Sequence, residues 1–386
     1  MIAGDSGDSY DSVADRKPRW VLQLCHGYDG PFMDCARQYA ALFKGTEYKV
    51  CTVYLTGSAS DDVRRGSASD EVVFLNYSSR QLRGLKLGAI NAVRKLVAAN
   101  EYELCIAHRF KPTYVALLGT SLPVIGIQHA FGVYRRRSRQ LLANVFGRRL
   151  LLLCVSDAVR DDVMDSLGTK DFSRVETLYN RIDIAAVRAQ LLSREAARRH
   201  LDLPDSAWVI ANVGRLHPDK DQATLIRGFA KARSELPDNA LLVIIGTGKL
   251  EADLRSLAED LCVEEAVLLL GQVPNARRYF KAFDVFALTS DHEPFGMVLL
   301  EAMAANTPII CADSGGAQEV VEGYGQIFPF ADATKLSECL LREYELNKDS
   351  NVCAERSGAL LVSHFSDDAA KRRFSSIINK RFLFKI

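Results

Sequence analysis

The stretch Ser290–Ala305, S-D-H-E-P-F-G-M-V-L-L-E-A-M-A-A, joins the end of a predicted strand to a loop and a helix. The apolar run 284–289 before it has the composition of a buried strand, and from about Gly296 the apolar residues follow a helical period. The loop contains Glu293, and Glu301 follows eight residues later. Eight residues are a little more than two helical turns, so both carboxylates can face one crevice.

Phe295 and Gly296 open this predicted helix. The first N–H groups of a helix have no partner within it, and together with the positive end of the helix dipole they form an anion site. Carboxylates accept hydrogen bonds from hydroxyl groups, and such amides bind phosphate. The stretch therefore suits a sugar nucleotide.

The composition of the chain limits the classes of protein to which it can belong. The chain has 386 residues, enough for two domains, and its 48% hydrophobic and 25% charged residues are typical of a soluble globular protein. The net charge is +1 and no nucleic-acid-binding motif is present, so we expect no nucleic-acid partner.

The cysteines and the first residues bear on the compartment. Nine cysteines, without a C-x-x-C pair, occur mostly in apolar runs and indicate reduced thiols in a cytoplasmic protein. Residues 1–19 are polar and acidic, and we expect a disordered leader. No apolar run approaches the roughly 20 residues of a membrane span.

Apolar runs in the first half of the chain alternate with helical patterns. The runs lie near 20–25, 49–55, 71–75, 103–107, 123–128 and 150–155, and the helical patterns near 32–43, 79–99, 111–119, 135–147 and 157–167. Such alternation predicts a parallel sheet covered on both faces, with ligands beyond the carboxyl ends of the strands. Gly27, His108 and His129 follow strands and are expected at that edge.

A second alternation begins after 172–204, which we interpret as the passage between two domains, with a helix over 184–200. Its strands are predicted near 207–213, 240–245, 266–270, 284–289, 308–311 and 326–329. The predicted division is a leader at 1–19, a first domain at 20–180, a second at 181–365 and a terminal helix at 366–386. Ser366 is the expected N-cap of that helix.

The twelve residues from Glu293, E-P-F-G-M-V-L-L-E-A-M-A, resemble the E-x7-E motif of a family of retaining glycosyltransferases that includes glycogen-synthase-like and lipopolysaccharide-core enzymes. The resemblance implies a GT-B fold of two Rossmann-like domains facing across a cleft, with the last helix returning to the first domain. It implies that Glu301 binds the ribose of the donor. Glu293, with the amides of Phe295, Gly296 and Met297, would bind the donor sugar.

A second segment, G-R-L-H-P-D-K-D from Gly214, resembles the G-R-L-x-P-x-K-D loop of the same family. The resemblance implies that Arg215 and Lys220 bind the diphosphate, since a leaving group with negative charge needs cations. The alternative is a solvated surface loop. No His or Cys cluster has metal-ligand spacing, so we expect activity without a metal or another cofactor.

Two further segments are candidates for contact with the nucleotide. I-I-G-T-G-K, which contains Gly246, resembles a loop where glycine lets backbone approach a ligand, although a plain strand-to-helix turn is equally compatible. L-G-Q-V-P matches a family segment whose backbone around Val273 meets the base.

The first domain resembles the family mainly in layout. I-G-I-Q-H-A-F-G places His129 where the family often has a histidine near the anomeric carbon of the reacting sugar. A structural role is the alternative, and it is equally open for His108. The loop after Cys25 departs from the family pattern, but Gly27 can still bring backbone near the phosphate.

The segment 135–149 contains six arginines and no acidic residue, with apolar residues interleaved. One interpretation is a solvated helix. The other is an amphipathic face for an anionic inner-leaflet membrane or a phosphorylated acceptor.

Together these features favour a retaining glycosyltransferase that uses a UDP- or GDP-sugar. The acceptor would be a saccharide or lipid-linked saccharide of lipopolysaccharide or cell-envelope polysaccharide synthesis. The alternatives are a catalytically silent nucleotide-sugar-binding protein and a nucleotide-sugar 2-epimerase of the same fold.

Overall fold

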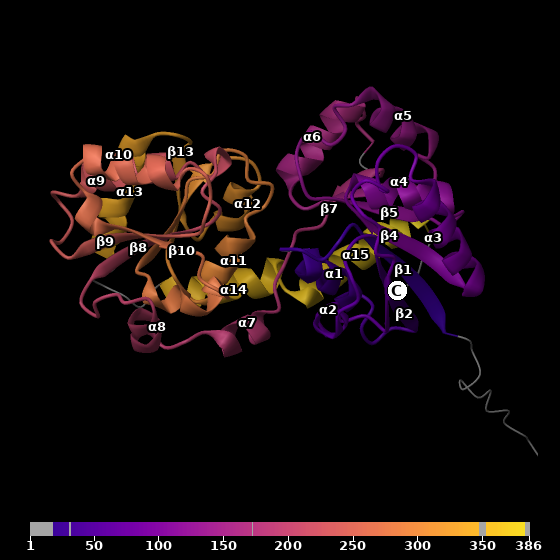
Figure 1. Cartoon of the computed structure of the whole chain (residues 1–386), viewed down its shortest axis with the longest axis horizontal. Helices are drawn as coiled ribbons and strands as arrows, with labels where there is room; N and C mark the ends of the chain where they lie inside the picture. Colours follow the sequence, from indigo (N-terminus) through magenta and orange to yellow (C-terminus); the bar gives the residue numbers. More distant parts are fainter. Residues whose placement is uncertain (1–17, 31, 172, 347–352, 383–386) are drawn as a thin grey trace, which may run out of the picture.

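Two parallel sheets, one in each of two lobes, form the frame of the protein (Figure 1). The computed structural model describes residues 18–30, 32–171, 173–346 and 353–382. The predicted leader therefore lies outside the described residues, except for Pro18 and for Arg19, which already belongs to the first strand.

The first sheet has seven strands in the order β3-β2-β1-β4-β5-β6-β7. They are β1 (Arg19–Cys25), β2 (Tyr48–Tyr54), β3 (Glu71–Phe74), β4 (Tyr102–His108), β5 (Val124–Gln128), β6 (Leu150–Cys154) and β7 (Val175–Thr177). The central strands are apolar at nearly every position, as β6 (L-L-L-L-C) illustrates, because helices cover both faces of the sheet.

Six helices connect these strands: α1 (Phe32–Ala41), α2 (Asp61–Gly66), α3 (Leu87–Ala99), α4 (Phe110–Gly119), α5 (Arg137–Val145) and α6 (Asp157–Leu167). The helix predicted over 79–99 begins only at Leu87. Gly84 and Lys86 have φ angles of 58° and 54°, in the left-handed region, which interrupts a helix.

The second sheet has six strands in the order β10-β9-β8-β11-β12-β13. They are β8 (Trp208–Val213), β9 (Ala240–Ile245), β10 (Val267–Gly271), β11 (Val285–Leu288), β12 (Ile309–Asp313) and β13 (Gln326–Pro329). The helices of this domain are α9 (Gln222–Ala232), α10 (Glu251–Asp260), α11 (Met297–Ala304), α12 (Ala317–Val321) and α13 (Ala333–Leu346).

The passage between the domains differs from the prediction. Residues 175–177 form β7 and extend the first sheet, and the single helix predicted over 184–200 is wrong. Two helices stand there, α7 (Ile184–Gln190) and α8 (Arg194–His200). Leu191 has an extended backbone, and the Ser193 hydroxyl accepts a hydrogen bond from the Ala196 N–H, which starts a new helix.

The end of the chain returns to the first domain through α14 (Cys353–His364) and α15 (Asp367–Phe382). Ser366 caps α15, as predicted, by accepting from the Ala369 N–H at 3.1 Å. On the first domain, the ring of Phe374 packs 5.8 Å from that of Phe43, and Arg181 pairs with Asp367 at 2.7 Å. The predicted fold, two parallel-sheet domains with a returning terminal helix, is confirmed.

Two further features concern the whole described chain. The cysteines that the structure describes are free thiols, and most of them are buried. Among the described residues, no helix is both long and apolar enough to cross a membrane.

Candidate functional site

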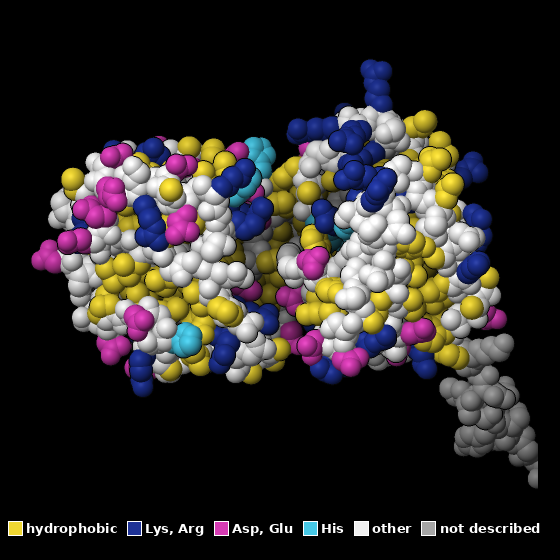
Figure 2. Space-filling model, in the orientation of Figure 1, with side chains coloured by type: hydrophobic (Ala, Val, Ile, Leu, Met, Phe, Trp, Pro, Cys, Tyr) yellow, Lys and Arg dark blue, Asp and Glu magenta, His cyan; other side chains and the backbone are white. Residues whose placement is uncertain are grey.

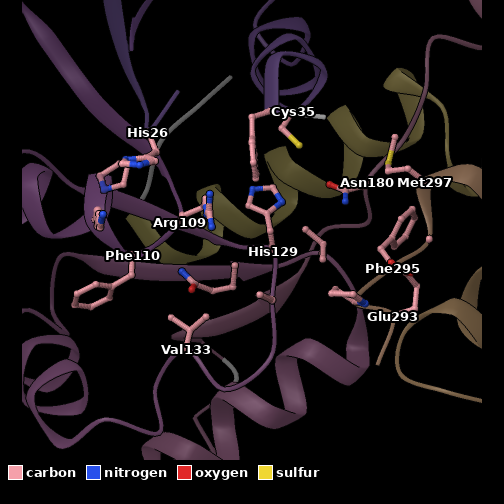
Figure 3. A pocket seen from close by; sticks show the side chains of 18 of the residues that line it. His26, Cys35, Arg109, Phe110, His129, Val133, Asn180, Glu293, Phe295 and Met297 are labelled. Atoms are coloured by element: carbon pink, nitrogen blue, oxygen red, sulfur yellow. The ribbon is translucent and has the colours of Figure 1, made fainter. Parts of the chain in front are cut away.

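A cavity of about 490 Å³ lies between the two domains, in the hollow that separates the lobes in Figure 2. The first domain contributes residues at the carboxyl ends of β1, β4 and β5, where parallel sheets usually bind ligands. The second domain contributes the loop 293–297 (Figure 3). The cavity thus brings predicted site residues of both domains together: His129, Glu293, Phe295, Gly296 and Met297.

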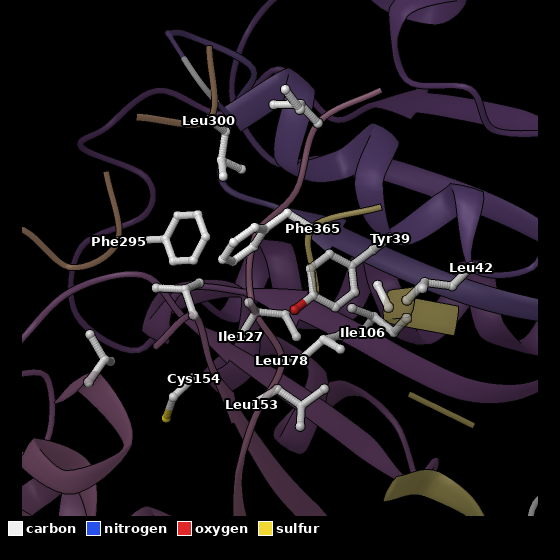
Figure 4. Packing of buried hydrophobic residues seen from close by; sticks show 14 of the residues in the cluster. Tyr39, Leu42, Ile106, Ile127, Leu153, Cys154, Leu178, Phe295, Leu300 and Phe365 are labelled. Carbon is white, nitrogen blue, oxygen red and sulfur yellow. The ribbon is translucent and has the colours of Figure 1, made fainter. Parts of the chain in front are cut away.

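The loop that carries Glu293 is fixed by its surroundings. The Gly316 N–H donates to the Glu293 carbonyl at 2.8 Å. Gly296 has a φ of 87°, which only glycine adopts freely, and begins α11. The ring of Phe295 packs against that of Phe365 at a centroid distance of 5.9 Å (Figure 4). Its centroid also lies 6.0 Å from that of Tyr179. The carboxylate of Glu293 is therefore presented from a rigid wall.

Lys220 reaches the same wall from the short 3-10 helix Pro218–Lys220. Its Nζ lies 2.6 Å from Glu293 Oε2, and both side chains are largely buried. The Thr289 hydroxyl donates to the Lys220 carbonyl at 2.8 Å, which anchors the loop to the end of β11. Arg215 is different: its side chain is 70% exposed and pairs with Asp219 at 3.3 Å, outside the cavity wall.

Two of the predicted donor-site glycines, Gly246 and Gly27, stand where another part of the chain approaches the backbone closely. A Cβ on Gly246 would lie 1.9 Å from the Gly214 carbonyl oxygen, so only glycine permits the loops after β8 and β9 to touch. A Cβ on Gly27 would lie 2.6 Å from the Thr56 hydroxyl oxygen. Gly27, Gly214, Gly246 and Val273 do not line the cavity.

Glu301 lies in the second turn of α11, also outside the cavity wall. Burial raises the pKa of its carboxyl to about 7, while Arg277 lowers it and Asp34 raises it further. Arg277 lies 3.9 Å from Asp34, so these groups meet where the two domains approach each other. Within the described chain no hydrogen bond to the Glu301 carboxylate is found, which leaves it available to a ligand.

His129 is oriented by a chain of hydrogen bonds. Gln23, which is fully buried, donates its amide N–H groups to the Ala36 carbonyl and the Thr52 hydroxyl. Its Oε1 therefore accepts from His108 Nε2 at 3.4 Å. A neutral His108 then accepts at Nδ1 from His129 Nε2 at 3.3 Å. This assignment leaves His129 Nδ1 as an acceptor, and it gives His108 a structural role.

The charge state of His129 supports this assignment. Burial, followed by the nearby guanidinium of Arg109, lowers its pKa to about 4. The imidazole is therefore neutral at neutral pH and can accept a hydrogen bond from a sugar hydroxyl.

Sequence reasoning missed several residues of the cavity wall: Arg109, Lys111, Gln128, Arg139 and Asn180. Arg109 follows a buried strand directly, and that position pointed to the ligand edge. Asn180 belonged to the predicted interdomain passage, and the sequence held no sign that it lines the cavity.

The sequence Asp219-Lys-Asp221 resembles a metal-binding pair, but its carboxylates are directed elsewhere. Asp219 lies 2.5 Å from His217 Nδ1, and Asp221 accepts from the Thr224 N–H at the start of α9. Among the described residues, no three His, Cys, Asp or Glu side chains are grouped to hold a metal ion. Independence of metal stays a prediction.

Comparison with known families assigns both halves of the chain. The model "Glycosyltransferase Family 4" matches residues 33–186, and the model "Glycosyl transferases group 1" matches residues 193–360.

Individual relatives match a smaller part. The N-acetylgalactosamine-N,N'-diacetylbacillosaminyl-diphospho-undecaprenol 4-alpha-N-acetylgalactosaminyltransferase of Campylobacter jejuni is 30% identical over 223 residues, 54% of this chain and 58% of the relative. The lipopolysaccharide core biosynthesis glycosyltransferase LpsE of Rhizobium meliloti is 33% identical over 174 residues, 45% of this chain and 50% of the relative. The chain spans about half the length of the relatives it matches.

Solved structures cover nearly the whole chain. A glycosyltransferase of Rickettsia africae has a TM-score of 0.80 at 13% identity, over 95% of this chain and 99% of that one. HepE of Anabaena, in complex with UDP and glucose, has a TM-score of 0.73 at 20% identity, over 94% of this chain and 100% of that one. At these identities the likeness concerns the fold.

Proposed function

The chain belongs to the glycosyltransferases that the group 1 and family 4 models describe, and we propose that it moves a sugar from a nucleoside diphosphate sugar to a saccharide or lipid-linked saccharide. One observation carries the proposal: His129 of the first domain meets Glu293 of the second in one cavity, with Lys220 beside Glu293. Such a cavity can hold a sugar between the domains while a cation faces its leaving group.

The proposed reaction breaks the bond between the anomeric carbon and the diphosphate oxygen. A new bond forms to the oxygen of an acceptor hydroxyl, whose proton passes to the departing diphosphate, and the anomeric configuration is retained. Negative charge grows on the departing diphosphate, so Lys220 and Arg215 stabilise the transition state. Glu293 and the amides of residues 295–297 hold the donor sugar, and His129 accepts from one of its hydroxyl groups.

The nucleotide would lie along the second domain. Glu301 accepts hydrogen bonds from the ribose, and the backbone of Gly214, Gly246 and Val273 runs beside the nucleotide. Gly27 would bring backbone near the phosphate from the first domain. The UDP and glucose of the HepE complex support a UDP-sugar donor, and GDP-sugars are the alternative.

A screen of UDP-, GDP- and ADP-sugars tests this proposal. Calorimetry measures binding, and mass spectrometry follows donor hydrolysis and transfer. We expect one donor class to bind and to turn over. Binding without turnover for any acceptor would instead support a silent nucleotide-sugar-binding protein, and an epimerised nucleotide sugar would support an epimerase.

The printed names of LpsE and of the Campylobacter enzyme support a role in lipopolysaccharide or cell-envelope polysaccharide synthesis. A site on the inner leaflet fits such a role. Lys and Arg side chains gather over the part of the first-domain lobe where Figure 1 shows α5 and α6 (Figure 2). Leu141 and Val145 on α5 are 66% and 67% exposed, beside the exposed Arg136 and Arg137.

We therefore infer that this face docks reversibly on an anionic membrane. Each basic residue near such a surface contributes about 1 kcal/mol, which salt screens. Not all of the predicted basic stretch takes part, because Arg149 donates to the carbonyls of Leu117, Thr120 and Leu122. Flotation with anionic and neutral vesicles at low and high salt tests the inference. Protein that ignores anionic vesicles at low salt would contradict it.

A further inference from the structure

The first-domain side of the cavity carries three basic side chains, Arg109, Lys111 and Arg139. Arg109 and Lys111 lie where β4 passes into α4, and Arg139 comes from α5. Of the described residues that line the cavity, Glu293 alone has a carboxylate, and Lys220 already pairs with it. Within the described part of the chain, none of the three basic side chains forms an ion pair. This wall therefore has positive charge without a matching anion.

Aromatic rings hold two of these cations in place. The guanidinium of Arg109 lies 4.7 Å from the ring centroid of Phe32, and that of Arg139 lies 4.4 Å from the ring centroid of Phe110. Arg139 also donates to the Val133 carbonyl at 2.8 Å. Both guanidinium groups are thus fixed before a ligand arrives, which reduces the entropy that binding must overcome.

The backbone of Arg109 has an unusual conformation. Its φ is 75° and its ψ is 167°, in a region that is almost restricted to glycine. Strain of this kind is concentrated at functional sites. An arginine that occupies this strained position at the cavity indicates that the side chain has a use there.

The same three cations lower the pKa of two neighbouring basic groups, His26 and Lys86. Burial lowers the pKa of His26, and Lys111 and Arg109 lower it further, against the weaker opposing effect of Asp29. Burial also lowers the pKa of Lys86, again with Lys111 and Arg139 as the next causes. A bound anion would relieve this repulsion.

Two buried amide oxygens on the same cavity have no hydrogen-bond partner among the described residues: Asn180 Oδ1 and Gln128 Oε1. Gln128 is fully buried and Asn180 is 6% exposed. Figure 3 shows the Asn180 side chain near His129, on the cavity. Carbonyl oxygens left without a donor at a ligand site suit hydroxyl groups.

We propose that the acceptor is a phosphate or diphosphate ester of a sugar or polyol, whose phosphate binds Arg109, Lys111 and Arg139 while its hydroxyl groups donate to Asn180 and Gln128. The proposal rests on the proposed glycosyl transfer and specifies its acceptor. The phosphate can belong to a soluble sugar phosphate or to a lipid head group, since the chemistry that binds it is the same.

Calorimetry with defined probes tests the proposal. The soluble probes are glucose 1-phosphate and, without the phosphate, methyl glucoside. The lipid probe is phosphatidylinositol in phosphatidylcholine vesicles. The variants are Lys111→Ala and Arg109→Gly, of which the second removes the charge and suits the positive φ. Arg227→Ala, which changes an exposed arginine on α9 of the second domain, outside the cavity wall, is the matched control.

We expect glucose 1-phosphate to bind more tightly than methyl glucoside, and each cavity variant to weaken its binding about 10-fold or more. Arg227→Ala should leave that affinity unchanged. If instead only the phosphatidylinositol vesicles bind, and the two cavity variants but not Arg227→Ala abolish the binding, the phosphate is that of a lipid head group.

Equal affinity for the two soluble probes, together with vesicle binding that the cavity variants do not change, would overturn the proposal. It would also be overturned if Lys111→Ala and Arg109→Gly weakened UDP or GDP and not the phosphate probes, because the cations would then belong to the donor site. UDP and GDP binding by the unmodified protein is measured in parallel. Its absence would overturn the proposed glycosyl transfer, whereas the phosphate probes report on the acceptor wall alone.

Discussion

The substitution Glu301→Gln tests two properties of this carboxylate separately. One is the free energy of unfolding that is lost when the charged group is buried, and the other is its contribution to nucleotide binding. Glutamine keeps the shape and an acceptor oxygen of Glu301 but cannot ionise. The carboxyl of Glu301 has a pKa of about 7 in the folded chain, mainly because burial disfavours its charged form, against 4.5 as the ordinary value. The substitution therefore removes a group whose charge the ligand-free fold does not compensate.

The size of the effect follows from the two pKa values. Between pH 4.5 and 7 the unfolded chain has released this proton and the folded chain retains it, so the free energy of unfolding falls as pH rises. At about 1.4 kcal/mol per pKa unit, the protonated carboxyl contributes about 3 kcal/mol to the free energy of unfolding. This contribution is fully present near pH 4 and is lost by about pH 8. Relative to the natural chain, the free energy of unfolding of Glu301→Gln should therefore rise by about 3 kcal/mol when the pH is raised from 4 to 8.

Urea unfolding of both proteins across this pH range gives the stability difference. Calorimetry at pH 7 in buffers of different ionisation enthalpy gives the protons released when UDP or GDP binds. The ribose hydroxyls favour the ionised carboxylate, so the natural chain should release about half a proton at pH 7, and Glu301→Gln none from this site. Affinity at pH 8 should fall about 10-fold in Glu301→Gln, because a charged acceptor is lost.

A stability difference that is constant from pH 4 to pH 8 would refute the reasoning about burial. If the stability difference varies with pH as expected but the nucleotide affinity of Glu301→Gln is unchanged, the burial argument stands and only the role of Glu301 in binding is refuted. Glu322→Gln, the same chemical change at an exposed position, is the matched control.

Three further outcomes are expected. Lys220→Ala and Arg215→Ala should each lower turnover about 100- to 1,000-fold in initial-rate assays with little change in the urea midpoint, and near-normal rates in both would contradict the diphosphate assignment. EDTA should leave turnover unchanged; loss of activity that manganese restores would contradict metal independence. Asp367→Ala should lower the free energy of unfolding by about 1.5–3 kcal/mol in urea, because the buried guanidinium of Arg181 loses its partner, whereas the exposed Asp368→Ala should not.

The fold was predictable because its determinants are local in the sequence. The run of leucines at 150–153 can be buried on both faces only in a covered parallel sheet, and the same logic places every predicted strand. The helix break at Leu191 was harder to predict, since no glycine or proline marks it. Its cause is the cap from Ser193, a residue that also occurs within helices.

The second-domain side of the cavity could be predicted more completely than the first-domain side, where the sequence indicated His129. The second-domain wall comes from one continuous motif, Glu293–Met297, and Lys220 belongs to a recognisable loop. The first-domain wall combines Arg109 from the end of β4 with Asn180 from the chain after β7, more than 70 residues apart in the sequence. No local pattern encodes that meeting, because it depends on how the strands are ordered in the sheet.

The ligand-free arrangement of charge suggests how binding of the two halves of the donor is coupled. Lys220 and Glu293 neutralise each other at 2.6 Å when the cleft is empty. In the proposed function the diphosphate draws Lys220 away, and the sugar hydroxyls then donate to the freed Glu293 carboxylate. A nucleoside diphosphate without its sugar would take the cation and leave a largely buried carboxylate unpaired, which is unfavourable. The Lys220–Glu293 ion pair thus favours binding of the complete nucleoside diphosphate sugar over binding of the free nucleoside diphosphate, which is the product that must leave.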